Sequence, residues 1–274
     1  MGEIIVKKEK FYYNVKLNRP DKHNAMSQKM IQELTEFFKT AGNDKFAKVI
    51  VLRGAGTSFC AGGDLAWMKS SINFKIKENM ADATKLFDLF DAAAKCPLPI
   101  LSYVQGNIFG GGIGLVSICD IAIAEANAKF CFSEVKIGLV PAVISSFVLQ
   151  KMHINKAKEL MLTGRIFNAD TAHSSGLVEY VGRELEAKEQ LDEILYLIGS
   201  NGPKAIRLVK RLFYNQRFMN EAQIKADSIK TIAECRVSAE GQEGLKSFLE
   251  KRKPAWAWIT QEDEDEVRDR DEGE

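Results

Sequence analysis

Residues 99–124 decide the fold, and they read PILSYVQGNIFGGGIGLVSICDIAIA. Two short apolar runs in this stretch, Ile100–Val104 and Ile121–Ala124, are typical of buried strands. Between them a glycine-rich turn at Gly110–Gly114 leads into Leu115–Cys119, which we expect to be an apolar helix. A strand, a glycine turn, a helix and a further strand in succession predict an α/β fold.

The mixture of strands and helices continues outward from this stretch. Ile4–Leu17 predicts a pair of strands, and Ser27 begins an amphipathic helix with apolar residues at helical spacing. Further helices are expected over Ala81–Lys95 and Phe147–Leu162. From Glu184 to about residue 249 the whole pattern is helical. The first two thirds of the chain therefore combine strands with helices, and the last third is helical.

The composition limits the class of protein. The chain has 274 residues, of which 46% are hydrophobic, so it is long enough to bury a sizeable core. There is no run of about 18 apolar residues, and the charged stretch Met1–Lys10 does not resemble a signal peptide. The five cysteines are scattered and form no CxxC pair. We therefore expect no membrane partner and a reducing, cytoplasmic location.

The charge is distributed unevenly along the chain. Residues 261–274 carry nine acidic residues and two arginines, so we expect residues 259–274 to form a disordered acidic tail. Residues 1–260 then hold 36 basic and 28 acidic residues, a net charge of +8. This basic body suits a polyanionic ligand such as a nucleotide or coenzyme A, although an ordinary surface with an acidic tail is the simpler interpretation.

Several catalytic classes are disfavoured by their missing motifs. The three histidines form no HxxxH or HExxH pattern, which argues against a zinc hydrolase, and we expect no metal site. There is no GxSxG elbow and no GxxxxGK[ST] loop. The run at Gly112 fails the dinucleotide fingerprint GxGxxG because Ser117 occupies the third glycine position.

Two glycine-rich turns are the strongest candidates for chemistry. One is Phe59–Asp64, and the other is Gly110–Gly112 at the start of the predicted helix. Glycine lets the backbone approach a ligand closely, and unpaired N–H groups at such turns can stabilise an oxyanion. Each turn taken alone is more often only a tight turn. Two of them, with one N–H from each, could form an oxyanion hole.

Several segments in series resemble the crotonase family, the enoyl-CoA hydratase/isomerase superfamily. The resemblance runs in order from about residue 4 to residue 258. One stretch, Glu134–Ser145, is most similar to a bacterial branch assigned to methylglutaconyl-CoA hydration in leucine breakdown. The segments that carry the resemblance are Asn18–Ala25, Phe59–Leu65, Gly106–Asp120, Ser133–Pro141, Gly164–Val178 and Gly244–Arg252.

The resemblance implies an architecture and an assembly. It implies a spiral of ββα units over residues 1–200 that binds acyl-CoA, and a C-terminal helical region over residues 201–258 that serves oligomerisation. Homotrimers, which often pair into hexamers, are expected. The ligand would be an acyl-CoA thioester, so coenzyme A is part of the substrate and no separate cofactor is expected.

By position, the resemblance also implies roles for individual residues. The oxyanion hole would be formed by the backbone N–H groups of Gly63 and Gly111. The residues expected to bind or lie near the acyl-CoA are Lys22, Ala61, Asp64, Phe248 and Lys251. For the two lysines, a role as ordinary solvated surface residues is an equal alternative.

The acid–base residues depart from the family pattern. Hydratases of this family hold a water molecule between two glutamates, and the second of them matches Glu134. The first would fall at Gly114, which can neither accept nor donate a proton. Glu134 is therefore the one candidate for a general acid or base. A surface glutamate at a strand end is the alternative interpretation.

One carboxylate leaves several reactions open. It suffices for moving a proton between two carbons, as in a 3-enoyl-CoA to 2-enoyl-CoA isomerase, and it could serve a decarboxylase. Hydration with one carboxylate needs another group, or a carboxylate of the substrate, to orient the water. We predict a hydratase, a lyase acting on a branched or carboxylated 2-enoyl-CoA such as methylglutaconyl-CoA. A non-catalytic acyl-CoA or RNA binder stays open, but no basic–aromatic interleaving favours nucleic acid.

Overall fold

The computed structural model describes residues 2–257 of the chain. Their contacts form two compact units, which divide after Asp192, within helix α8 (Glu184–Ser200). The boundary expected from the sequence, after residue 200, lies at the end of the same helix. The acidic tail expected over 259–274 lies outside the described residues.

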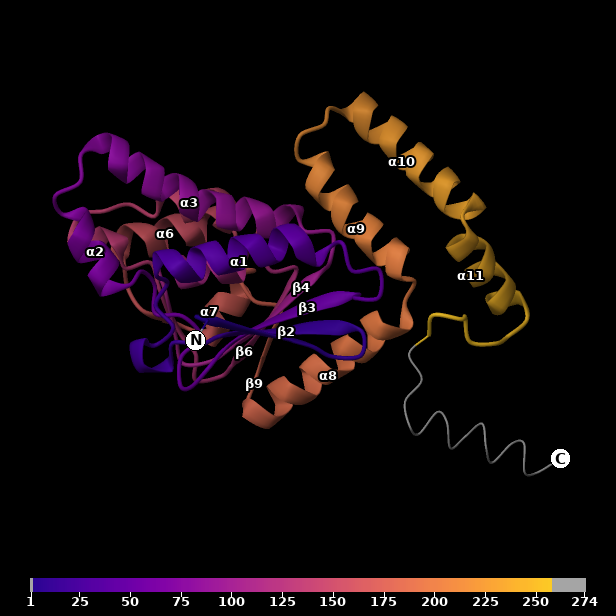
Figure 1. Ribbon diagram of the computed structural model, residues 1–274, viewed down its shortest axis with the longest axis horizontal. Helices are drawn as coiled ribbons and strands as arrows, with labels where there is room; N and C mark the ends of the chain where they lie inside the picture. Colours follow the sequence, from indigo (N-terminus) through magenta and orange to yellow (C-terminus); the bar gives the residue numbers. More distant parts are fainter. Residues whose placement is uncertain (1, 258–274) are drawn as a thin grey trace. The chain divides into compact units, whose positions relative to one another are not determined.

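The first unit is built on a six-stranded sheet that is mostly parallel (Figure 1). The outer pair β1–β2 is an antiparallel hairpin, as the sequence predicts for Ile4–Leu17, and every other neighbouring pair is parallel. This confirms the predicted α/β class. The strands in their order across the sheet are β1 (Ile4–Lys8), β2 (Tyr12–Leu17), β3 (Val49–Gly54), β4 (Ile100–Val104), β6 (Ile121–Glu125) and β9 (Tyr180–Gly182).

A second, three-stranded sheet lies beyond the first. Its strands are β5 (Asn107–Phe109), β7 (Lys129–Cys131) and β8 (Phe167–Asn168), with β5 parallel to β7 and β8 antiparallel to β7. The chain passes from β4 of the first sheet to β5 of the second and then into α4 (Gly111–Ser117). This succession is one ββα unit. It places the glycine turn directly after β5, which is an edge strand of the second sheet.

Helices α1 (Gln28–Ala41) and α3 (Ile76–Lys95) pack against each other over the first sheet (Figure 1). Ser27 caps α1, since its side chain accepts a hydrogen bond from the Met30 N–H at 3.1 Å. The predicted amphipathic helix is confirmed, because its apolar side chains are buried. Helix α3 begins five residues before the predicted Ala81. A short helix that was not predicted, α2 (Leu65–Ser71), precedes it.

The helix expected over Phe147–Leu162 is wrong as a single element. The structure has α5 (Ala142–Val148) and α6 (Ile154–Thr163) instead. The chain leaves the helical conformation at His153, whose φ and ψ are −57° and 122° and whose N–H donates to the Ser175 carbonyl at 2.8 Å. This bond joins the break to the end of α7 (Ala169–Ser174), a contact between segments distant in sequence.

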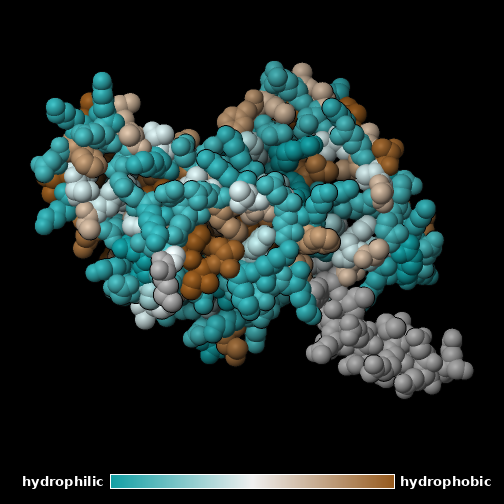
Figure 2. Space-filling view, viewed as in Figure 1, coloured by the Kyte–Doolittle hydropathy of each residue, from teal (hydrophilic) through white to brown (hydrophobic). Residues whose placement is uncertain are grey.

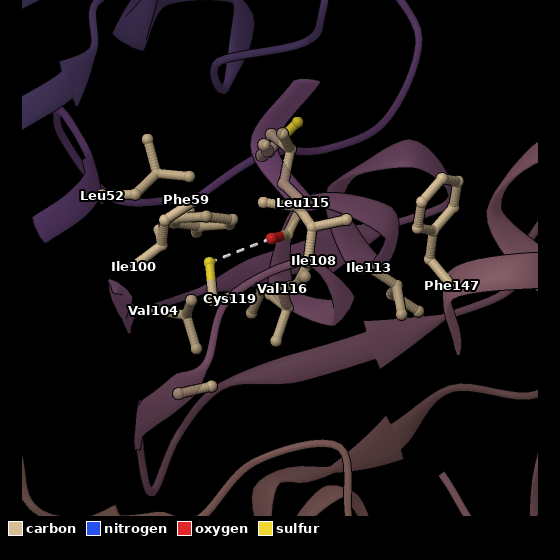
Figure 3. Close-up of a cluster of buried hydrophobic side chains, with 14 of the residues drawn as sticks. Leu52, Phe59, Ile100, Val104, Ile108, Ile113, Leu115, Val116, Cys119 and Phe147 are labelled. Atoms are coloured by element: carbon tan, nitrogen blue, oxygen red, sulfur yellow. Dashed lines mark hydrogen bonds between the residues drawn. The ribbon is translucent and has the colours of Figure 1, made fainter. Parts of the chain in front are cut away.

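The core of the first unit gathers around α4 (Figure 3). Strand residues such as Leu52 and Val104 pack with Phe59 and with Leu115 of α4, and all four are fully buried. The Cys119 thiol lies in the same cluster and donates to the Leu115 carbonyl at 3.1 Å. The apolar helix after the glycine run is confirmed, but it begins at Gly111, within the run, so the glycine turn is held directly on the core.

The second unit is helical, as predicted for the last third of the chain. Besides the end of α8 it contains α9 (Pro203–Gln216), α10 (Glu221–Val237) and α11 (Ala239–Leu249). Asn220 caps α10, and Ser238 caps α11 by accepting from the Gly241 N–H at 3.0 Å. Within residues 2–257, no helix is both long and apolar enough to cross a membrane.

Candidate active site

The turn at Gly63 presents an unused backbone donor. The chain at Met26 runs beside it: the Met26 N–H donates to the Gly62 carbonyl at 2.8 Å, and the Asp64 N–H donates to the Met26 carbonyl at 3.0 Å. Between these bonds, no oxygen of the described residues accepts from the Gly63 N–H. Gly62 has φ +101°, a conformation that glycine adopts without strain, so this residue type fixes the direction of the turn.

The turn at Gly111 presents a second unused backbone donor. Gly110, with φ +46°, donates to the Cys131 carbonyl at 2.9 Å and precedes the first residue of α4. The N–H of a first helical residue has no acceptor inside its own helix. No oxygen of residues 2–257 accepts from the Gly111 N–H.

Pairing between two loop segments brings these turns together. The Phe109 N–H donates to the Cys60 carbonyl at 3.0 Å, and Cys60 forms a parallel bridge with Ile108. Gly112 lies against the same Cys60 carbonyl, and a Cβ atom there would collide with it. A glycine is therefore required at 112 for the two turns to approach. The juxtaposition expected from the two glycine-rich segments is present, and their role as an oxyanion hole stays a prediction.

Glu134 lies at the Gly110 turn. It is the first residue of the 3₁₀ helix η2 (Glu134–Ile137), and its Oε1 would be 3.1 Å from a Cβ atom built on Gly110. Its Oε2 is buried and has no hydrogen-bond partner among the described residues. Burial raises the pKa of the Glu134 carboxyl above its ordinary range, because the loss of water from the charged form outweighs a hydrogen bond from its own backbone N–H. A carboxyl with a raised pKa is the kind of group that general acid–base catalysis uses.

The place of the second carboxylate is filled by apolar side chains. A Cβ atom built on Gly114 would be 2.6 Å from Cζ of Phe90 and 2.7 Å from Cγ2 of Ile144. Both distances are far below van der Waals contact, so a glutamate side chain has no space at this position. No second carboxylate stands at position 114, and the role of Glu134 as the acid–base group stays a prediction.

The comparisons with known proteins agree with this geometry. Residues 8–258 match the family model of enoyl-CoA hydratase/isomerase. The chain belongs to the enoyl-CoA hydratase/isomerase family. It is 32% identical over 255 residues to a crotonyl-CoA hydratase of Syntrophomonas wolfei, with 91% of this chain and 96% of the relative covered.

Two further relatives of this enoyl-CoA hydratase/isomerase family member are named for two different reactions. An enoyl-CoA hydratase from Shewanella pealeana has a solved structure that superimposes with a TM-score of 0.87 at 35% identity, covering 93% of this chain and 96% of that one. A mitochondrial Δ(3,5)-Δ(2,4)-dienoyl-CoA isomerase of Pongo abelii is 35% identical over 222 residues, with 76% of this chain and 67% of the relative covered. Both reaction types thus occur among its relatives.

Among the predicted binding residues, Lys22 and Ala61 lie on adjoining segments. Lys22 is the last residue of η1 (Pro20–Lys22) and is exposed. Ala61 is half-buried, and its N–H donates to the His23 carbonyl at 3.0 Å. The two residues therefore flank the turn that carries Gly63. Their contact with coenzyme A stays a prediction.

Asp64 is occupied by contacts within the protein. Its Oδ1 accepts from the backbone N–H groups of Ala66 and Trp67, which caps α2. Its Oδ2 accepts from Nη2 of Arg19 at 2.7 Å. These bonds lower the pKa of the Asp64 carboxyl against the effect of its burial. They are the contacts of a residue that positions the Gly63 turn, and the predicted proximity of Asp64 to the acyl group is not tested by them.

Phe248 and Lys251 belong to the second unit. Phe248 lies near the end of α11 and is 79% exposed. Lys251 follows the helix with φ +54°. Their predicted contact with coenzyme A stays a prediction.

Sequence reasoning assigned no role to Asn24, which is fully buried beside the site. Its Nδ2 donates to the carbonyls of Ala55 and Ser58 at 2.8 and 2.7 Å, and its Oδ1 accepts from the Arg19 N–H at 2.8 Å. Its φ is +54°, a conformation that asparagine tolerates better than most residues. The signal was an asparagine within the quoted Asn18–Ala25 segment, where such a side chain often bonds to its own turn.

The cysteines give no second nucleophile. Burial raises the pKa of the Cys60 thiol to about 12, so it is protonated at neutral pH. Cys60 therefore packs as a small apolar residue. Within residues 2–257, no cluster of histidine, cysteine and acidic side chains is arranged to hold a metal ion.

Proposed function

We propose that this protein hydrates a 2-enoyl-CoA whose acyl group is branched or carries a carboxylate, with Glu134 as its acid–base residue. One observation supports this above all. The Glu134 carboxylate, whose Oε2 is buried without a partner, lies against the Gly110 turn directly before the unused N–H of Gly111. A proton-transfer group thus adjoins a place where negative charge can be held.

The reaction follows from these groups. The thioester oxygen accepts hydrogen bonds from the N–H groups of Gly63 and Gly111. A water oxygen bonds to C3 while Glu134 takes a proton from that water, and the electron pair of the double bond moves into the thioester enolate. Glu134 then returns the proton to C2. Preorganised donors of this kind are worth about 3 kcal/mol each in transition-state stabilisation.

The carboxylated substrate supplies what the protein lacks. With Phe90 and Ile144 filling the space at Gly114, no carboxylate stands at this position to orient the water. A carboxylate of the substrate near C3 would do so. The similarity of Glu134–Ser145 to the methylglutaconyl-CoA branch supports the same choice. The coenzyme A moiety is bound as part of the substrate, and no further cofactor takes part.

An isomerase is the second candidate. The space filled at Gly114 leaves Glu134 to act alone, and a single carboxylate can remove a proton at C2 of a 3-enoyl-CoA and return it at C4. The isomerase shares the enolate and the oxyanion donors with the hydratase. Only the consumption of water distinguishes the two reactions.

A mass-spectrometric assay separates these candidates. The purified protein is incubated with 2-enoyl and 3-enoyl-CoA esters, including methylglutaconyl-CoA, beside the variant Glu134→Gln. We expect one 2-enoyl ester to gain the mass of water and the variant to lose about 10²–10⁴-fold in turnover. Conversion of a 3-enoyl ester at constant mass identifies the isomerase. Inertness toward every ester contradicts both and favours a binding protein.

We also propose a homotrimeric or homohexameric assembly and a cytoplasmic location. The assembly is supported by apolar side chains exposed on α10 and α11, among them Val237, which is 80% exposed. Figure 2 shows brown, hydrophobic atoms among teal ones on the surface where α10 lies in Figure 1. The location is supported by the five cysteines, all of which are free thiols.

A further inference from the structure

A polar cavity lies at the carboxyl ends of the strands of the first sheet. Its volume is about 440 Å³, and its walls come from the ends of β2, β3, β4 and β6 and from the start of α8. None of Gly63, Gly111 and Glu134 lines it. The carboxyl ends of parallel strands are where open α/β sheets commonly bind ligands.

Arg53 brings an unpaired charge to this cavity. Its Nε is buried and has no hydrogen-bond acceptor among the described residues, and its guanidinium lies 5.6 Å from the centre of the Tyr103 ring. A buried donor without an acceptor lowers the stability of the folded state, and more so when it is charged. The cavity therefore lacks an acceptor for this group.

Gln105 leaves an acceptor unpaired in the same cavity. Its Nε2 donates to the carbonyls of Gly54 and Gly56 at 2.8 and 3.1 Å. These two carbonyls fix the orientation of the amide, because only its nitrogen can donate to them. The Oε1 atom that results is buried without a donor among residues 2–257. The cavity thus offers one buried donor and one buried acceptor.

The charges around the cavity favour an anion. Its two carboxylates already have partners: Glu125 accepts from the Tyr103 hydroxyl at 2.7 Å, and Glu184 is paired with Lys188 at 2.5 Å. Arg53 and Lys16 line the cavity too, and no carboxylate of the described residues forms an ion pair with either. The lining holds three cationic side chains and two carboxylates, so its net formal charge is +1.

The geometry points to a second binding site in this cavity, for a small ligand that carries a phosphoryl group next to a hydroxyl. The phosphoryl oxygens would accept from Arg53 and from Lys16. The hydroxyl would donate to Oε1 of Gln105. This inference is independent of the proposed hydration, since it uses none of the residues that perform it.

Isothermal titration calorimetry on the full chain tests the site with two probes, glycerol 3-phosphate and inorganic phosphate. We expect saturable binding of both, tighter for glycerol 3-phosphate because it adds the hydroxyl. Arg53→Met and Lys16→Gln should each weaken binding roughly tenfold or more. Arg236→Met, which removes a charge from exposed α10, is the matched control and should leave binding unchanged.

Three results would overturn the proposal. They are the absence of binding at millimolar probe, binding that Arg53→Met and Lys16→Gln leave intact, and displacement of the probe by saturating coenzyme A. The last would make the cavity part of the acyl-CoA site. Lys16 is exposed on β2, so its variant tests the site even if Arg53→Met does not fold. Acyl-CoA turnover of both variants is expected to equal that of the parent protein.

Discussion

A buried carboxylate oxygen without a hydrogen bond is unusual in a folded protein, and Oε2 of Glu134 is one among the described residues. The other oxygen of this carboxylate, Oε1, lies against a glycine turn. The one stabilising contact of the ionised carboxylate, a hydrogen bond from its own backbone N–H, is outweighed by its desolvation. Proteins retain such costs mainly where function requires them. The residue that weakens the fold is the one that we propose for proton transfer.

This cost predicts a pH-dependent gain in stability for Glu134→Gln. The pKa of Glu134 is raised in the folded state, so the folded protein binds more protons than the unfolded chain between the two pKa values. Stability of the parent protein thus falls as pH rises through that window. The variant does not titrate, so its advantage in Tm should be near zero at about pH 4 and greatest at about pH 8.

Thermal unfolding of both proteins across this pH range measures the difference. Glu134→Asp is the control, since it keeps a titrating carboxyl and should follow the parent protein. A constant Tm difference at every pH would mean that the Glu134 carboxyl is not desolvated in the folded protein.

Asn24 is expected to position the Gly63 turn. Asn24→Gly keeps the left-handed backbone but removes three buried hydrogen bonds. The carbonyls of Ala55 and Ser58 lose their donors, so unfolding free energy should fall by about 2–4 kcal/mol. Asn24→Ala should cost about 1 kcal/mol more, because a Cβ atom is strained at φ +54°. Urea unfolding measures both values.

Activity separates a positioning role for Asn24 from a purely structural one. At a temperature where Asn24→Gly is fully folded, kcat should drop roughly tenfold with a smaller change in KM, because the oxyanion donor is displaced. An unchanged kcat in the folded variant would contradict the positioning role.

At the scale of elements, helix α4 is held in place by the side chains that pack against its glycines. Gly114→Ala places a Cβ atom 2.6 Å from Phe90 and 2.7 Å from Ile144, so we expect a loss of about 1–3 kcal/mol in unfolding free energy. Ile144→Ala alone also destabilises by leaving a cavity. The double variant should lose less than the sum, since the cavity accepts the new methyl group. Additive losses, measured by urea unfolding, would contradict the contact.

Local patterns predicted the long elements well and the short ones poorly. The helix after Ser27 and the strand Ile100–Val104 carry enough residues for a period or an apolar run to be visible. Strands β5, β7 and β8 have two or three residues each, too few for any period. The break before α6 depends on a bond from His153 to Ser175, which no local pattern contains.

The residues of the candidate site were likewise predictable from the sequence only in part. Gly63, Gly111 and Glu134 could be selected because each lies in a motif that is continuous in sequence. The absence of a carboxylate at Gly114 was also readable directly. The side chains that fill the space at Gly114 could not be predicted, because Phe90 comes from α3 and Ile144 from α5. Only the folded chain brings these side chains onto α4.

At the scale of the whole molecule, apolar exposure predicts self-association. Phe213, Ile229 and Val237 of the second unit are 74%, 59% and 80% exposed. Burying such side chains between copies would remove a large apolar area from water. We therefore expect light scattering to give the mass of a trimer or a hexamer. Val237→Glu should shift this mass toward the monomer, because the new charge would be buried without a partner.

Lys225→Glu is the matched control for that shift. It makes a charge change on the same helix, at an exposed polar position, and should leave the mass unchanged. The apparent Tm should rise with protein concentration in the parent protein and in Lys225→Glu, since association stabilises the folded state by mass action. It should be independent of concentration in Val237→Glu. A parent protein that is monomeric at all concentrations would contradict the assembly, and its exposed α10 face would then need another partner.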